Sequence, residues 1–245
     1  MLKRAKDPYD IQSEIEDFHW WFVVRKKLLK KVLSSFRLPP ESIAADIGCG
    51  TGSNLSILGS IGHSVIGLDR SIHALHLTRK KLKFPVINGD LNELPFKNES
   101  LGLIIAMDVL EHLENDLNGI QEFYRTLRNG GMLVLTVPAF NFLWGIQDLV
   151  TGHKRRYSQK EILIKLRECG FRALRVSYFN FFLFFPILLA RRIMSLLKLK
   201  VESENEINSP LLNFFLKAIF SLEPYLLKYF SFPFGVSILC VAKKK

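Results

Sequence analysis

The sequence predicts an α/β protein with a doubly wound, mostly parallel sheet, and two observations carry this prediction. From residue 42 to residue 138, short apolar segments alternate with helical segments. Strands that are apolar on both faces and joined by helices are typical of a parallel sheet covered on both sides. In addition, the glycine-rich stretch "DIGCGTG", residues 46–52, follows the first apolar segment directly. Ligands bind at such turns in α/β sheets.

The apolar segments set the expected strands. They cover residues 42–48, 63–69, 85–90, 101–108, 131–138, 171–179 and 235–244. The expected helices cover residues 10–33, 52–59, the stretch before Leu82, 109–128 and 158–169. Gly130 and Gly131 should stop the fourth helix, while Ser158 and Glu161 form a capping-box signal for the last one. Residues 139–157 look like a loop.

Composition shifts divide the chain into four parts. Residues 1–39 form a helical lid that ends at Pro39-Pro40, residues 40–180 form the core, and residues 181–230 form an apolar helical insertion. Residues 231–245 return as the last strand of the sheet. The apolar stretch 178–190 is too short to cross a bilayer, which takes about 20 apolar residues. We therefore expect any membrane contact through residues 178–230 to be peripheral.

Charge and cysteine content narrow the class of protein. The net charge of +11 suits an anionic partner or surface, but the basic residues are spread along the chain. This spread favours a solvated surface over a nucleic-acid stripe. The three cysteines show no CxxC pairing, and no apolar segment follows the N-terminal "MLKRAKDPYD". Both features predict a cytoplasmic protein, and association with membranes stays open at this point.

Acidic residues follow successive strands beside the glycine-rich stretch. Gly48 and Gly50 fit the GxGxxG fingerprint, whereas Gly52 comes one residue early. Asp69 ends the second strand 21 residues after Gly48, and Asp90 follows the third. A carboxylate at the position of Asp69 can accept hydrogen bonds from ribose hydroxyls, and Asp90 lies at the next strand end along the same edge. Asp46 would oppose a pyrophosphate and suit an ammonium or sulfonium cation.

The motifs "DIGCGTG", "GLD", "NGD" and "AMDVLEHL", in this order at successive strand ends, resemble the class I S-adenosylmethionine-dependent methyltransferases. The resemblance covers residues 40–140. It implies a Rossmann-like, seven-stranded sheet with an antiparallel last strand, and S-adenosyl-L-methionine as cofactor. The residues that it places around the cofactor are Asp46, Gly48, Cys49, Gly50, Gly52, Asp69, Arg70, Asp90, Leu91, Met107 and Asp108.

Three segments supply the other candidate site residues. The stretch "HWWF" and Arg25 resemble a helix that covers the cofactor, so Trp20 and Arg25 could close the pocket, although packing against the sheet is the alternative. His112 of "EHL" could act as a base or cap the cofactor edge. In "TGHKRRYS", His153 could deprotonate an acceptor, Arg155 or Arg156 could bind an acid or phosphate, and Tyr157 could orient the acceptor. The alternative is a solvated basic loop.

These features predict a methyltransferase that methylates an oxygen of a small or amphipathic acceptor, which could be lipid-linked. One alternative is a membrane-peripheral protein that binds the cofactor without turnover, and another is an RNA methyltransferase, although nucleic acid is the less favoured partner. No metal site is expected, since His73 and His76 lack a third ligand. The apolar insertion could contact lipid, the acceptor or a second subunit, and the oligomeric state is open.

Overall fold

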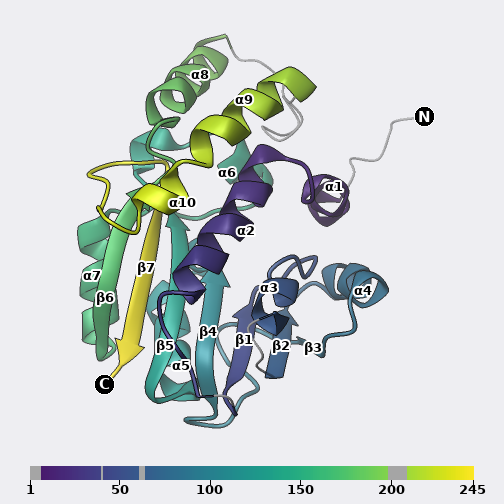
Figure 1. Ribbon diagram of the computed structural model, residues 1–245, viewed down its shortest axis with the longest axis vertical. Coiled ribbons are helices and arrows are strands. Elements are labelled where there is room, and N and C mark those ends of the chain that lie inside the picture. The colour runs from purple at the N-terminus through teal and green to yellow at the C-terminus, as the bar shows by residue number, and fades with distance from the viewer. Residues whose placement is uncertain (1–6, 40, 61–63, 198–208) are drawn as a thin grey trace.

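The computed structural model describes residues 7–39, 41–60, 64–197 and 209–245. Its centre is a seven-stranded sheet in the order β3-β2-β1-β4-β5-β7-β6 (Figure 1). Strands β1 to β5 pair in parallel, and β7 runs antiparallel to both β5 and β6. The strands are β1 (Ile43–Ile47), β2 (Ser64–Asp69), β3 (Val86–Asn88), β4 (Leu101–Met107), β5 (Leu127–Pro138), β6 (Phe171–Phe179) and β7 (Ser237–Lys244). This confirms the predicted sheet and its antiparallel last strand.

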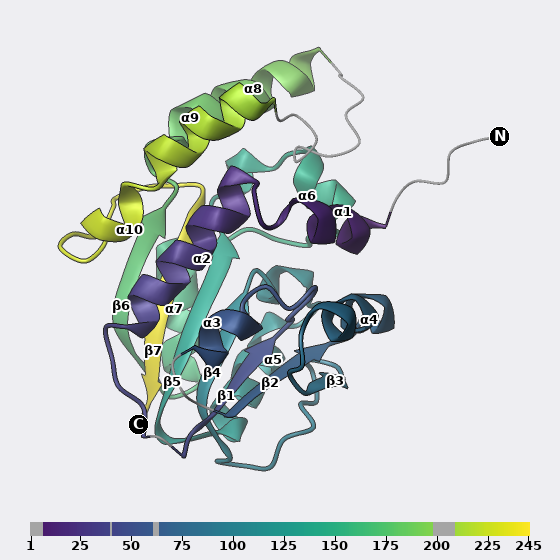
Figure 2. The same ribbon diagram turned by 45° about the vertical axis from the view of Figure 1, so that its right-hand side comes forward.

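Helices cover both faces of this sheet. In both views α2 and α3 lie over one face, and α5 and α7 lie behind the other (Figures 1 and 2). The helical segments before the insertion are α1 (Pro8–Ile15), α2 (Trp20–Leu33), α3 (Leu55–Gly59), α4 (Ile72–Lys81), the 3₁₀ turn η1 (Leu110–His112), α5 (Asp116–Thr126), η2 (Asn141–Leu143), α6 (Ile146–Val150) and α7 (Gln159–Glu168). The entirely buried strand β4 shows why the sheet needs two helical layers.

The single N-terminal helix predicted over residues 10–33 is in fact two helices. Asp7 caps α1 and Pro8 occupies its first position, a start signal that the sequence analysis did not use. The chain then turns, and His19 accepts a hydrogen bond from the Trp21 backbone N–H at the start of α2. Burial lowers the pKa of His19 to about 4, so its ring is neutral and can accept this bond. Because of this break, α1 and α2 run in different directions.

Other predicted boundaries also shift. The helix expected over residues 109–128 is split into η1 and α5, and Asn115 caps the second piece. Gly130 and Gly131 do not stop a helix but lie inside β5, which begins at Leu127. The helix expected from Gly52 begins at Leu55. The stretch 139–157 is more ordered than a loop, because it contains η2 and α6.

The insertion before the last strand is helical, as the pattern predicts. It comprises α8 (Phe184–Leu196), α9 (Pro210–Phe220) and α10 (Glu223–Leu226). Helices α8 and α9 lie side by side at the end of the molecule toward which β1, β4 and β5 run (Figures 1 and 2). No helix in the described ranges combines the length and apolarity needed to cross a membrane.

Aromatic stacking joins α2 to the insertion and to the sheet. The Trp21 ring lies nearly parallel to Phe179 of β6 and Phe220 of α9, with ring centroids 6.0 and 5.7 Å apart. Phe179 and Phe220 are fully buried. The Arg25 guanidinium lies 5.3 Å from the centre of the Trp21 ring, which favours a cation. Trp21 therefore holds three segments that are distant in sequence.

We predict that Trp21→Ala lowers the free energy of unfolding by about 3 kcal/mol, because it removes a large stacked ring from a packed site. Urea denaturation followed by circular dichroism measures the change. Phe18→Ala is the matched control, because Phe18 is 55% exposed and its loss should change the free energy by less than about 0.5 kcal/mol. Equal effects of the two substitutions would contradict the assigned packing.

Candidate active site

The glycine loop follows β1 and folds back on β2. The backbone N–H groups of Gly48 and Cys49 both donate to the Leu68 carbonyl, at 2.7 and 2.9 Å. Gly48 and Gly52 have φ of +76° and +82°, where a side chain is strained. A Cβ at Gly48 would also lie 2.7 Å from a Val109 methyl group. Glycine is therefore required by the shape of the loop.

Asp69, at the end of β2, holds the glycine loop by hydrogen bonds. Its Oδ2 accepts the Gly50 N–H at 2.8 Å, and its Oδ1 accepts the Ser71 N–H at 2.8 Å. Asp69 is 4% exposed. The structure thus places the predicted ribose-binding carboxylate directly beside the loop that the sequence singled out.

Asp46 is a buried carboxyl group whose charge is poorly compensated. It is fully buried in β1, and neither oxygen has a hydrogen-bond partner of good geometry. Burial and the nearby negative charge of Asp69 together raise the pKa of Asp46 to about 7, although Asn54 and Arg25 act in the opposite direction. Asp46 therefore favours an added cation nearby.

Arg25 of α2 reaches the end of β4. Its Nη2 lies 2.7 Å from Oδ2 of Asp108, with the two side chains 14% and 21% exposed. Asp108 has φ of +58°, an unfavourable value for a residue with a side chain. Thr136 stabilises it, because its carbonyl accepts the Asp108 N–H and its hydroxyl donates to Asp108 Oδ1. The ion pair therefore brings the N-terminal segment to the carboxyl edge of the sheet, and closure of the pocket by Arg25 stays a prediction.

His153 is held by a buried carboxylate that the sequence analysis missed. Its Nδ1 lies 2.8 Å from Oδ1 of Asp148 in α6. Arg156 donates to both oxygens of Asp148 at 2.9 Å, and Gly145 N–H donates to Oδ2. Although burial opposes the shift, hydrogen bonds from His153 and Arg156 lower the pKa of Asp148 to about 2. Ionised Asp148 therefore accepts a hydrogen bond from the Nδ1–H group of His153. In a neutral ring this leaves Nε2 as the hydrogen-bond acceptor.

The Nε2 atom of His153 faces a second buried carboxyl group. It lies 3.8 Å from Oε1 of Glu111, which is fully buried and has no hydrogen bond on either oxygen. Burial raises the pKa of Glu111, and the Asp108 charge adds to the rise. The His112 ring packs edge-on against His153, with centroids 4.9 Å apart. Burial, with a contribution from His153, lowers the pKa of His112 to about 4, so this ring is neutral.

Within the described part of the chain, one group has the arrangement of a possible metal site. Glu111, His112 and His153 each offer one ligand atom, and these atoms lie within 4.8 Å of one another. The hydrogen bond from His153 to Asp148 resembles the support that metal-bound histidines receive. His73, considered for a metal from its spacing, instead pairs with Asp10 at 2.8 Å.

Part of the basic loop is used for contacts within the protein, while Lys154 is exposed. Arg156 is buried on Asp148, and Arg155 donates to the carbonyls of Leu113 and Glu114. The Tyr157 hydroxyl is buried and donates to Asp116 at 2.9 Å, which together with burial raises its pKa. Arg155, Arg156 and Tyr157 therefore make contacts within the protein, and their predicted part in acceptor binding stays a prediction.

The remaining predicted residues occupy different settings. The structure places Met107 in the buried end of β4, and Leu91 and Cys49 among buried apolar neighbours. Asp90 is exposed and accepts from Asn92 within its own turn, and Arg70 is exposed. Trp20 packs on Phe220 of α9, with ring centroids 5.7 Å apart, so this contact is with the insertion rather than with the sheet.

Helix α1 also contacts the glycine loop, which the sequence analysis did not predict. The Tyr9 hydroxyl lies 3.5 Å from Oδ1 of Asp69, and the Gln12 amide donates to the Thr51 hydroxyl at 3.2 Å. Burial raises the pKa of Tyr9 to about 12. Buried Glu16 accepts from Thr51 and, at 2.8 Å, from Lys81. The N-terminal segment is therefore fastened over the loop by polar contacts.

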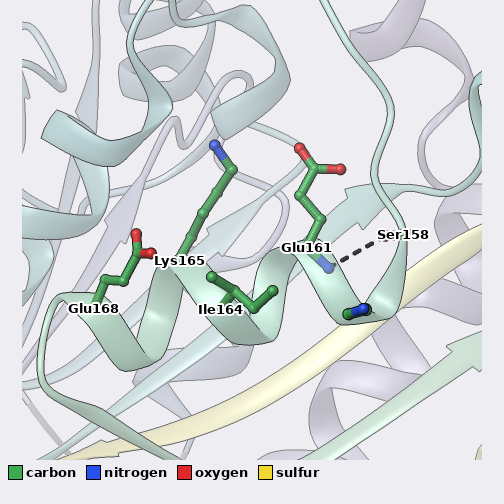
Figure 3. A pocket seen from close by; sticks show the side chains of 6 residues that line it. Ser158, Glu161, Ile164, Lys165 and Glu168 are labelled. Atoms are coloured by element: carbon green, nitrogen blue, oxygen red, sulfur yellow. Dashed lines mark hydrogen bonds between the residues drawn. The ribbon is translucent and has the colours of Figure 1, made fainter.

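A separate shallow groove runs along α7, away from these residues. Figure 3 shows its polar side chains on one side of the helix, with Ser158 accepting the Glu161 N–H. Its lining comprises Ser158, Lys160, Glu161, Ile164, Lys165 and Glu168. None of the predicted site residues lines this groove, so the strand ends remain the candidate site.

Comparison with known proteins identifies the fold. A family model described as a methyltransferase domain matches residues 45–135. Residues 45–135 therefore match a methyltransferase domain, in agreement with the class I S-adenosylmethionine-dependent methyltransferases that the strand-end motifs resemble. A Haemonchus contortus phosphoethanolamine N-methyltransferase solved with S-adenosyl-L-methionine has a TM-score of 0.59 and 18% identity over 89% of this chain and 52% of that one.

Relatives in sequence support the same domain. The chain is 28% identical over 141 residues to a "Probable S-adenosylmethionine-dependent methyltransferase" of Mycobacterium tuberculosis, covering 55% of this chain and 52% of that protein. It is 30% identical over 123 residues to a mouse tRNA (carboxymethyluridine(34)-5-O)-methyltransferase, covering 49% and 17%. The chain spans about half the length of the first curated relatives it matches.

S-adenosylmethionine is the cofactor of this methyltransferase domain. The residues present fit it, because Asp46 is buried with two unpartnered oxygens and the cofactor carries a positive sulfonium. The methyltransferase resemblance assigns the ribose to Asp69 and the methionine part to Asp46 and the glycine loop. When bound, the cofactor supplies a methyl group activated on a positively charged sulfur.

We predict that affinity for S-adenosylmethionine rises with pH in the neutral range. Because the pKa of Asp46 is raised to about 7, the free protein holds a proton there that a bound cation displaces. A single proton released from this group gives about tenfold tighter binding at pH 8 than at pH 6. Calorimetry at a series of pH values measures the affinity.

Asp46→Asn is the control, because the amide cannot release a proton. Its binding should be weaker at pH 8 and nearly independent of pH. S-adenosylhomocysteine, which lacks the sulfonium charge, should show a smaller pH effect on the wild-type protein. An equal pH effect in wild type and Asp46→Asn would contradict the assignment.

Proposed function

We propose that the whole chain is an S-adenosylmethionine-dependent methyltransferase that transfers a methyl group to an oxygen of a small or amphipathic acceptor. The observation that carries the oxygen assignment is the buried Asp148–His153 pair beside Glu111. A hydroxyl acceptor needs a base, whereas a neutral amine already has a free lone pair. The apolar helices next to this loop favour an acceptor with an apolar part.

The residues of the chain divide the work of the proposed reaction. Asp148 keeps the proton on Nδ1 of His153, so Nε2 can accept the proton of an acceptor hydroxyl as the oxygen takes the methyl group. Ionised Asp148 then stabilises the resulting imidazolium. Arg25 and α1 cover the carboxyl edge and exclude water, and alignment of donor and acceptor supplies much of the rate acceleration.

The direct test combines binding with methyl transfer. Calorimetry should detect S-adenosylmethionine and S-adenosylhomocysteine, and Asp69→Ala should weaken both by at least about tenfold, since it removes a charged hydrogen-bond acceptor. Transfer from a radiolabelled donor is then measured into lipid, water-soluble and RNA fractions of the source cells. Absence of binding of both compounds would overturn the proposal.

RNA is the second candidate acceptor, favoured by the net charge of +11 and by the likeness to a tRNA methyltransferase. In that case the label enters the RNA fraction, and binding to RNA weakens steeply as salt rises because counterions are released. Label in the lipid or water-soluble fraction favours the first candidate. Cofactor binding without label in any fraction favours a binding protein without turnover.

We predict that His153→Ala lowers kcat on the labelled fraction by about 10²-fold, the usual contribution of a general base. The dissociation constant of S-adenosylmethionine should stay within about twofold, because His153 acts on the acceptor rather than on the cofactor. His76→Ala, at an exposed histidine of α4, should leave both values unchanged. An undiminished kcat in His153→Ala would exclude it as the base.

A further inference from the structure

The insertion exposes many large apolar side chains on its surface. More than half of the large apolar side chains that are exposed in the described residues lie on or beside α8, α9 and α10. We call this surface the insertion face. Its members are Phe185, Leu189, Ile193, Leu196, Leu211, Leu212, Phe214, Phe215, Ile219, Leu222, Tyr225, Tyr229 and Phe230. Patches of this kind mark sites that bind partners or membranes.

Basic side chains accompany the insertion face. Arg192 and Lys228 are exposed on it, and Lys31 of α2 lies 4.7 Å from the Tyr225 ring. Among described residues 181–230, Glu223 is the one acidic residue, and it is fully buried. Residues 198–208, outside the described part, add two lysines and three glutamates to the sequence. The described surface is therefore apolar with a positive rim.

We propose that the insertion face docks on the surface of a bilayer that contains anionic lipids. Exposed phenylalanines with flanking lysine and arginine are typical of helices that lie in the membrane interface. The lengths agree, because α8 has 13 residues and α9 has 11, both short of a span. In a twofold dimer through this face the same positive rims would meet, whereas anionic headgroups complement them.

The docking surface is joined to both halves of the candidate active site. Asn213 of α9 accepts the Trp20 N–H at 2.7 Å and donates to the Phe18 carbonyl, at the start of the helix that carries Arg25. Arg191 of α8 donates to the Leu143 carbonyl and lies 4.0 Å from Asp148, which holds His153. A bilayer beneath this face would therefore lie next to the lid and the acceptor loop.

Co-sedimentation of the full chain with vesicles tests the proposal. We expect binding to vesicles of phosphatidylcholine with phosphatidylglycerol, and weaker binding to phosphatidylcholine alone or at high salt, since salt screens the attraction. Phe214→Ser with Phe215→Ser should lower the bound fraction by about tenfold or more, because two apolar anchors are lost. Both residues are more than half exposed, so the fold should tolerate the change.

The matched control is Ile72→Ser with Leu174→Ser, two exposed apolar positions outside the insertion face, which should bind vesicles as the wild type does. Asp69→Ala should also bind them normally, so vesicle binding does not depend on the proposed methyl transfer. The proposal is overturned if wild type binds neither vesicle. It is also overturned if the double variant binds equally well, or if light scattering shows a stable dimer that the double substitution abolishes.

Discussion

The candidate site depends on buried negative charge that the protein itself leaves partly uncompensated. Asp46 and Glu111 are fully buried, and none of their four carboxyl oxygens has a hydrogen-bond partner of good geometry. Burying such groups costs free energy, and both respond with a raised pKa. Arg25 is the cation that lowers the pKa of both. The folded chain therefore maintains an acidic, water-poor environment suited to a positively charged ligand.

The arrangement of the N-terminal segment follows from this constraint. Arg25 lies on α2, which is not part of the sheet. Side-chain contacts therefore have to hold α2, and with it Arg25, in position. Trp21 stacks on Phe179 and Phe220, and Asn213 binds the first turn of α2. Phe220 and Asn213 belong to the apolar insertion, and Phe179 belongs to β6 of the sheet. The lid is thus positioned jointly by the sheet and by the segment that forms the exposed insertion face.

The sequence was informative where function depends on backbone shape and strand order. Glycines with positive φ and acidic residues at successive strand ends follow from local rules, so Gly48, Gly52, Asp46 and Asp69 could be found in advance. The two-helix N-terminal segment was missed because the helical pattern crosses the turn at residues 16–19 without a proline or glycine. The Asp7-Pro8 start signal would have indicated α1.

The role of Asp148 could not be found from the sequence, because it depends on which of the nearby basic residues contact this carboxylate in the folded chain. Basic residues in "GHKRRY" predict a surface that binds an external acid, yet Arg156 is used to hold Asp148, and Asp148 in turn orients His153. Tyrosine is likewise a residue type that is common in binding sites, yet Tyr157 is buried in the core.

Internal contacts of this kind cannot be recognised from the sequence. The core motifs therefore identify the cofactor, whereas the acceptor has to be inferred from the segments that surround His153. Those segments are α6, which carries Asp148, α8, whose Arg191 lies 4.0 Å from Asp148, and η1, whose Glu111 faces His153. A change in the position of α8 alters the surroundings of Asp148, and hence of His153, the proposed base. The two proposals, on the acceptor and on docking of the insertion face, therefore involve the same contacts.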